Sequence, residues 1–225
     1  MKGIRESKEM NEQAIRTQMV EACHRLYQRN MLAAGDGNVS FRLSDERILF
    51  TPSGRPKAFL EPDQITVMTL DGEVVEGTPS GERRMHLEIL RTCQEARCVV
   101  HAHPPHAVAW SLARPELKEL PSEHLSEVIL GAGRIPFVPY ARPTTAAMGE
   151  VLRPFLPECR AMILARHGAV CWGETLEEVI NGMERIEHSA QILWLAEAIG
   201  GSKPLPAVEV QVLRDMRTQM GAKLL

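Results

Sequence analysis

Cys98-Val-Val-His101-Ala-His103-Pro-Pro-His106 joins a short apolar run to closely spaced histidines. The apolar, partly β-branched residues at its start are typical of a buried strand, and Pro104 and Pro105 end that strand. Residues i and i+2 of a strand point to the same face, so His101 and His103 offer two imidazoles to one point in space. The segment predicts half of a metal site; the alternative is two polar residues where a strand surfaces into a loop.

A second apolar run, residues 161–165, is also followed by a histidine, in Arg166-His167-Gly168. If the two strands lie side by side, they supply three imidazoles. Three histidines with an open coordination position are the arrangement of a catalytic rather than a structural Zn²⁺ or similar divalent ion. The sequence therefore indicates a candidate metal site formed by His101, His103 and His167.

Length and composition set the class of protein. The chain has 225 residues, 44% hydrophobic and 24% charged, which favours a single α/β domain over residues 1–225. A formal charge of -3 and only 4% aromatic residues argue against a nucleic-acid surface. There is no apolar signal region and no apolar run near the ~20 residues that span a bilayer, so we expect a cytoplasmic protein. The five cysteines form no C-x-x-C pair and indicate neither disulfides nor a cysteine zinc site.

Hydrophobic periodicity predicts the elements. The expected helices cover residues 7–32, 82–93, 107–112, 121–130, 144–152, 175 to about 200, and a C-terminal stretch after Pro206. The expected strands cover residues 39–43, 48–50, 65–70, 74–75, 98–100, 161–165 and 169–172, and residues 135–140 are extended. Thr175 and Glu178 form a capping-box pattern at the start of the long helix, and Glu184 and Glu187 are expected on its solvated face.

Three loops of small residues, at 35–38, 51–54 and 77–81, follow predicted helices or strands. Each is a tight turn by composition, yet their backbone N–H groups and hydroxyls could converge on one anion. Glu82 begins the helix after the third loop, where the helix dipole favours a carboxylate. His86 lies one turn later on the same side, as a hydrogen-bond partner for Glu82.

Five motifs in this order and spacing resemble the class II aldolase/adducin family over roughly residues 14–199. They are Gly-Asn-Val-Ser-Phe-Arg (37–42), Thr-Pro-Ser-Gly (51–54), Pro-Ser-Gly-Glu-x-x-x-His (79–86), Val-Val-His-Ala-His (99–103) and Arg-His-Gly (166–168). The resemblance implies a three-layer α/β/α sandwich around a largely antiparallel sheet. It also implies a homotetramer with active sites between neighbouring subunits.

The resemblance also implies roles for residues. His101, His103 and His167 would bind a divalent metal, usually Zn²⁺, with Mn²⁺ or Co²⁺ as the alternatives, and Glu82 would be the acid/base beside it. The residues expected around a substrate phosphate are Gly37, Asn38, Ser53, Gly54, Ser80 and Gly81. The chain departs from the family pattern at Gly81, where many relatives have serine.

The second departure concerns the proton donor. Fuculose-phosphate-type aldolases use a tyrosine in the segment that aligns with residues 124–125 and another near the C-terminus. This chain has Leu125 and Met220 there, which leaves His124 or Tyr140 as the candidates.

The function implied by the resemblance is a metal-dependent aldolase acting on a ketose 1-phosphate, such as a deoxy or alkylthio sugar. It would release dihydroxyacetone phosphate and an aldehyde through an enediolate that the ion stabilises. The alternatives are a sugar-phosphate 4-epimerase, a decarboxylase of a 3-oxo sugar-acid phosphate that leaves the same enediolate, and a non-catalytic adducin-like scaffold. The expected partners are a phosphorylated sugar and other copies of the chain, without nucleic acid or membrane.

Overall fold

An eight-stranded sheet forms the middle of the molecule in the computed structural model, which describes residues 2–225, with the side chains of residues 2–11 excepted. The strands are β1 (Asn38–Ser44), β2 (Arg47–Phe50), β3 (Thr66–Met68), β4 (Val74–Glu76), β5 (Cys98–Ala102), β6 (Phe137–Val138), β7 (Ala161–Leu164) and β8 (Gly168–Gly173). Their order is β4-β3-β2-β1-β5-β8-β7-β6, and every neighbouring pair among them is antiparallel except β6 and β7. The prediction of a largely antiparallel sheet is confirmed.

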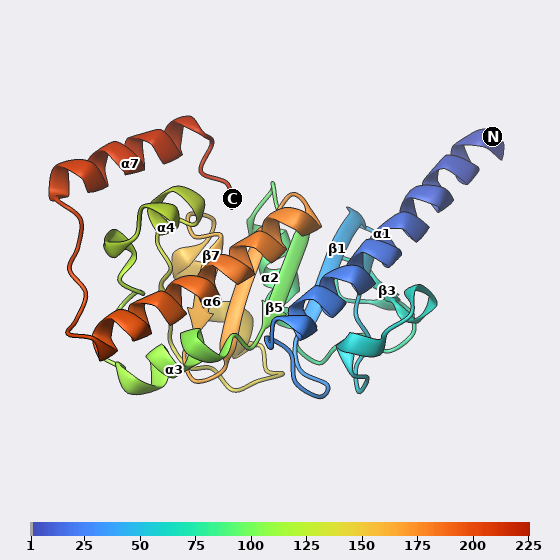
Figure 1. Ribbon diagram of the computed structural model, residues 1–225. Helices are drawn as coiled ribbons and strands as arrows, with labels where there is room; N and C mark the ends of the chain where they lie inside the picture. Colours follow the sequence, from blue (N-terminus) through green and yellow to red (C-terminus); the bar gives the residue numbers. More distant parts are fainter. Residues whose placement is uncertain (1) are drawn as a thin grey trace.

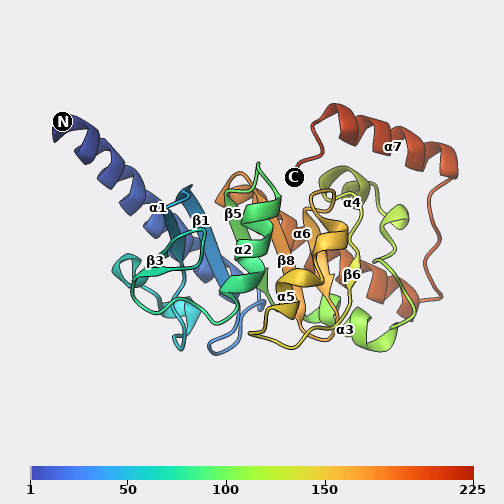
Figure 2. The same ribbon diagram turned by 180° about the vertical axis from the view of Figure 1, so that it is seen from behind.

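Helices cover both faces of the sheet. On one face lie α1 (Lys2–Gln28), α3 (Pro105–Ala113) and α6 (Leu176–Ala198), as Figure 1 shows. On the other face lie α2 (Arg83–Thr92) and α5 (Ala147–Glu150), which are in front in Figure 2. The helices α4 (Ser126–Gly131) and α7 (Ala207–Gln219) pack together beyond the β6 end of the sheet. Residues 2–225 also contain four short 3₁₀ helices: Lys57–Phe59, Pro62–Gln64, Ser122–His124 and Arg153–Phe155. The predicted three-layer α/β/α sandwich is confirmed.

Strand β5 lies between β1 and β8 and is buried at every residue. Its alternate side chains enter two separate cores: Val100 packs beneath α1 and α6, whereas Val99 packs on the side of α2. Because side chains two apart share a face, His101 points to the α2 side as Val99 does. The same parity in β1 places Asn38 and Ser40 on the α2 side, opposite the core residue Val39.

The prediction that the two histidine-bearing strands lie side by side is wrong, because β8 lies between β5 and β7. Residues 165–167 form a tight turn in which Arg166 has a φ of 63°, so β8 folds back on β7 and then pairs with β5. His167 reaches the end of β5 from this turn, since β8 begins beside Ala102.

Three of the predicted helices differ in extent from the helices that the structure shows. The helix expected over 121–130 is interrupted at Leu125, whose extended backbone (φ -134°, ψ 119°) separates a 3₁₀ turn from α4. The helix expected over 144–152 contracts to α5, and α1 ends at Gln28. Thr175 caps α6 by accepting the N–H of Glu178, but the Glu178 carboxylate accepts from Arg160 (2.9 Å) and does not return to Thr175. Within the described chain, the helices are all too short or too polar to cross a membrane.

Candidate metal and carboxylate site

Three imidazoles converge at the end of β5. His101 and His103 lie on the same side of the strand, and His167 joins them from the β7–β8 turn. The Nε2 atoms of His101 and His103 are 3.1 Å apart, and one nitrogen from each of the three rings lies within 4.8 Å of the others. Gly168 makes room for them, because a Cβ there would lie 2.8 Å from the rings of both His101 and His103. The structure thus brings together the three histidines singled out in the sequence.

The Nδ1 atoms of His101 and His103 face away from the cluster and lie close to hydrogen-bond acceptors. His101 Nδ1 lies 2.9 Å from the carbonyl oxygen of Ala169, and His103 Nδ1 lies 3.3 Å from Asp36 Oδ2. With Nδ1–H donating, each Nε2 lone pair faces the centre of the cluster. Burial lowers the pKa of His101 to about 3 and also lowers the pKa of His103, so both rings are neutral at physiological pH. Neutral imidazoles oriented by a carbonyl and a carboxylate fit a divalent metal ion.

Glu82 stands at the N-terminus of α2 and faces the cluster. Its Oε2 is 3.3 Å from His101 Nε2, and its Oε1 is 3.2 Å from His167 Nε2. The Asn38 amide donates to Oε2 at 2.8 Å. Burial alone would raise the pKa of Glu82, but the hydrogen bonds from His167 and Asn38 outweigh it and hold the pKa well below its usual range. Glu82 is therefore an ionised carboxylate at neutral pH, adjacent to the candidate ligands.

The loops at residues 35–38 and 77–81 lie beside Glu82, and the loop at residues 51–54 lies beside the loop at 77–81. Ser80 Oγ accepts from the Asn38 amide at 3.2 Å and from the Glu82 N–H at 3.3 Å. Residues 51–54 run along residues 78–80, with the Ser53 N–H donating to the Thr78 carbonyl. Ser53 and Gly54 are exposed, and Gly81 is half-buried.

Gly37 has a structural reason to be glycine. Its φ is 70°, and a Cβ there would lie 2.9 Å from the His101 carbonyl oxygen. A residue without a Cβ is needed for this approach of the first loop to β5.

His86 and Asp36 have partners in the structure that the sequence did not predict. His86 bonds to Ser40 and Asn38, whereas Glu82 was expected as its partner, because α2 lies over β1 and turns the ring toward that strand. The sequence does not predict Asp36 as the partner of His103. The one indication is that Asp36 is a carboxylate in a glycine loop, two residues before Asn38.

The two candidate proton donors lie apart from the histidines. His124 belongs to the 3₁₀ turn before α4, and Tyr140 follows β6 with its side chain exposed. Within residues 12–225, whose side chains the structure describes, neither residue hydrogen-bonds or stacks with the histidine cluster.

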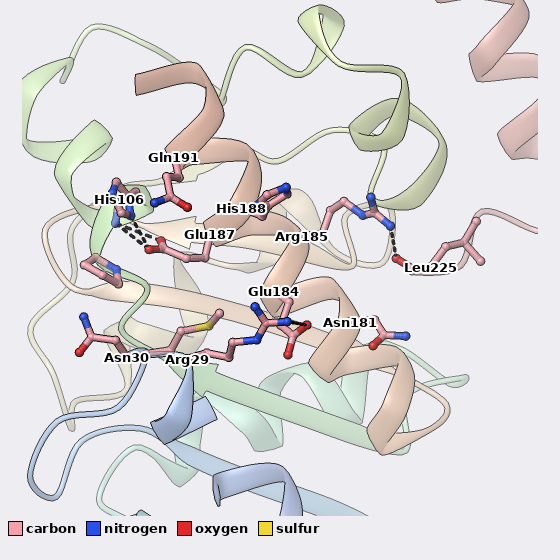
Figure 3. Close-up of a pocket in the computed structure, with 12 residues that line it drawn as sticks. Arg29, Asn30, His106, Asn181, Glu184, Arg185, Glu187, His188, Gln191 and Leu225 are labelled. Atoms are coloured by element: carbon pink, nitrogen blue, oxygen red, sulfur yellow. Dashed lines mark hydrogen bonds and ion pairs between the residues drawn. The ribbon is translucent and has the colours of Figure 1, made fainter. Parts of the chain in front are cut away.

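His106, the last histidine of the segment 98–106, is not part of the three-histidine cluster. It lines a polar pocket of about 570 Å³ between the end of α1, the start of α3 and α6 (Figure 3). Its Nδ1 is 2.6 Å from Glu187 Oε1, and Glu187 also accepts the backbone N–H groups of His106 and Ala107. The expectation that Glu187 is solvated is wrong, because it is buried and caps the free N–H groups of α3.

Asp36→Asn is expected to weaken metal binding about 10- to 100-fold, the usual effect of removing a carboxylate that orients a ligand histidine. The neutral amide no longer fixes the His103 tautomer as the carboxylate does. Competition with a chromophoric chelator measures the change. Asp45→Asn is the matched control, because Asp45 pairs with Arg42 at the β1–β2 turn. Equal affinity in wild type and Asp36→Asn would contradict the assigned role.

Comparison with known proteins adds to this geometry. The family model described as Class II Aldolase and Adducin N-terminal domain matches residues 17–194. A 3-oxo-tetronate 4-phosphate decarboxylase of Escherichia coli is 30% identical over 213 residues, 92% of this chain and 97% of that protein. An L-fuculose phosphate aldolase of Methanococcus vannielii is 31% identical over 175 residues, 78% of this chain and 93% of that protein. The crystal structure of YgbL from Escherichia coli superposes with a TM-score of 0.84 at 30% identity, covering 90% of this chain and 99% of that one.

Proposed function

We propose that this chain, which belongs to the class II aldolase and adducin family, is a metal-dependent decarboxylase of a small 3-oxo sugar-acid phosphate. The observation that carries this choice is the likeness to the Escherichia coli 3-oxo-tetronate 4-phosphate decarboxylase over nearly the whole of both chains. Leu125 and Met220 support it, because they stand where the aldolase resemblance implies tyrosines that move protons. Loss of CO₂ releases no aldehyde, so no residue is needed to take up the hydroxyl proton that aldehyde formation removes.

The chemistry of such a substrate suits the site. In 3-oxo-tetronate 4-phosphate, C2 carries the carboxyl carbon and lies next to the C3 ketone. Departure of the carboxyl carbon as CO₂ leaves its electron pair on C2, delocalised toward the C3 oxygen as an enediolate. One proton added to C2 then gives dihydroxyacetone phosphate. A divalent ion at His101, His103 and His167 would supply Lewis-acid stabilisation of the negative charge on oxygen.

The chain's own residues have the remaining tasks. Glu82 is proposed to carry one proton from solvent to C2, since it faces the histidines from the N-terminus of α2. The exposed loop at Ser53 and Gly54 and the loop at Ser80 and Gly81 are proposed to hold the phosphate together with Gly37 and Asn38. Their hydroxyl and backbone N–H groups are the donors that a phosphate requires.

A second candidate is an aldolase of a ketose 1-phosphate, which the 31% identity to the Methanococcus vannielii L-fuculose phosphate aldolase favours. Both reactions pass through the same enediolate and release dihydroxyacetone phosphate. They differ in the other fragment, which is CO₂ in one case and an aldehyde in the other. A 4-epimerase would return an isomeric sugar phosphate and no fragment.

The proposed assembly is a homotetramer with active sites shared between subunits. An apolar row along α7 and its C-cap supports it, because these side chains recur every four residues and are exposed in the single chain: Val208, Val212 and Met216 on the helix and Met220 at the cap. Such a row is suited to be covered by another copy.

The test measures both products of the proposed reaction. Metal-loaded protein is given 3-oxo-tetronate 4-phosphate labelled at C1, and released CO₂ and dihydroxyacetone phosphate are measured together. Parallel reactions contain a panel of ketose 1-phosphates with an aldehyde trap, and chelator-treated protein reports spontaneous decay of the 3-oxo acid. Equal amounts of CO₂ and triose phosphate are expected. Aldehyde from a ketose 1-phosphate, without metal-dependent CO₂, would replace the decarboxylase with the aldolase.

A further inference from the structure

We propose that the side chain of Thr144 takes the place of a side chain at position 81 and donates its hydroxyl to the substrate phosphate. This deepens the proposed function and rests on the phosphate site proposed there. Thr144 lies between β6 and α5, in a segment that contains none of the phosphate residues expected from the sequence. The observation behind the proposal is that Gly81 and Thr144 each stand where the backbone favours the other.

The backbone conformations of Gly81 and Thr144 are the reverse of what their side chains favour. Thr144 has a φ of 66°, in the left-handed region, where a β-branched side chain is strained. The φ of Gly81 lies outside that region, so its conformation does not require glycine. Local preference alone would put glycine at 144 and a side chain at 81. The strained threonine therefore calls for another explanation, and strain of this kind is concentrated at functional sites.

The Thr144 side chain occupies the space that a side chain at position 81 would enter. A Cβ built on Gly81 would lie 3.1 Å from Thr144 Cγ2 and 3.6 Å from Thr144 Cβ. The first distance is shorter than an ordinary van der Waals contact, so the two positions share room for one side chain. The family resemblance implies a serine hydroxyl at 81. Thr144 brings a hydroxyl to the same side of the loop that contains Ser80.

The Thr144 hydroxyl is available to a ligand. Thr144 is exposed, and within residues 12–225 its hydroxyl has no hydrogen-bond partner in the protein. The neighbouring Thr145 differs, because its hydroxyl donates to the Arg142 carbonyl oxygen at 2.7 Å and closes the turn before α5. A threonine hydroxyl has one proton to donate, and phosphate oxygens accept such bonds.

The segment around Thr144 is held on both sides. It leads into α5, which packs closely on α2 (Figure 2), since Gly149 leaves no room for a Cβ beside that helix. Before Thr144, Ala141 lines the same small cavity as His167. The segment thus extends from a candidate metal ligand to Gly81. A substrate with its phosphate at the loop and its reacting carbon at the histidines would lie along this segment.

The experiment separates the hydroxyl of Thr144 from its shape. Inorganic phosphate is titrated calorimetrically into metal-loaded and chelator-treated protein in parallel, because phosphate bound to the metal appears only in the first. Thr144→Val keeps the branched shape and is expected to raise the phosphate Kd about tenfold, for the loss of one hydrogen bond to a charged group. Thr144→Ser keeps the hydroxyl and should stay within about twofold of wild type.

Thr17→Val is the matched control, because the Thr17 hydroxyl donates to the Gln13 carbonyl oxygen within α1. Its phosphate Kd is expected to equal that of the wild type. A Kd within about twofold of wild type in Thr144→Val would overturn the proposal. Wild-type protein that binds no phosphate, or binds it only through the metal, would overturn it as well.

Exchange of the two residues tests the replacement itself. Thr144→Gly is expected to raise the melting temperature by about 2–4 °C through relief of backbone strain, and to raise the phosphate Kd about tenfold. Adding Gly81→Ser to this variant should return the Kd to within about twofold of wild type, because a hydroxyl again stands beside Ser80. A double variant that keeps its stability but recovers no phosphate binding would show that the two side chains are not equivalent and would overturn the proposal.

The binding measurements do not depend on turnover. If Thr144→Val weakens phosphate binding and the wild type releases neither CO₂ nor aldehyde, the role of Thr144 stands and the proposed reaction fails. With a substrate that the wild type accepts, Thr144→Val should raise KM about tenfold and leave kcat within about twofold, since the phosphate is bound equally before and during the reaction. A lower kcat with unchanged KM and unchanged phosphate Kd would overturn the proposal.

Discussion

Glu82→Gln is expected to reduce kcat by about 10²- to 10⁴-fold, the contribution of a positioned general acid/base. The amide has almost the same shape as the carboxylate and keeps the hydrogen-bonding positions beside His101, His167 and Asn38. It cannot accept and release a proton near neutral pH. The variant should therefore keep its bound metal and its KM while the chemical step slows.

The measurement is steady-state kinetics on protein whose metal content has been determined. Glu88→Gln is the matched control, because Glu88 lies on the same helix and pairs with Arg153 on the surface. The control should turn over at the wild-type rate. Near wild-type kcat in folded, metal-loaded Glu82→Gln would remove Glu82 from the reaction and would leave the metal assignment intact.

The strands that carry the site can be predicted because each has a pattern that a sheet requires. The alternation at residues 39–43 and the apolar run before His101 are confirmed as β1 and β5. The convergence of His101 and His103 follows from the two-residue period of a strand alone. The N-terminal position of Glu82 on α2 follows similarly from helix chemistry.

The order of the strands and the partners of buried polar groups cannot be predicted in this way. The place of β8 depends on the turn at Arg166, whose left-handed backbone has no signature because the residue is not glycine. His86 finds its partners 46 and 48 residues away, on β1. The sequence pattern of α6 predicts a solvated Glu187. Its partners in the structure are free N–H groups at the start of α3, some 80 residues earlier in the chain. These contacts are set by how the layers pack.

His101→Ala is expected to abolish stoichiometric metal binding, because His101 is the fully buried member of the three-histidine cluster. The loss should exceed the about 10- to 100-fold effect of removing an outer partner such as Asp36. Binding also stabilises the folded state: a metal ion at 100 times its Kd adds about 2.7 kcal/mol to the free energy of unfolding. Wild-type protein should show this increment when Zn²⁺ is added and lose it when a chelator is added.

His106→Ala is the control that makes the result specific to the cluster. His106 lies in the same nine-residue segment but pairs with Glu187 at the start of α3. It should bind metal as the wild type does, even if its own stability falls through the lost contact. Metal-dependent stabilisation in His106→Ala and its absence in His101→Ala would locate the ion at the end of β5. The reverse pattern would move it to the pocket of Figure 3 and would separate the ion from Glu82.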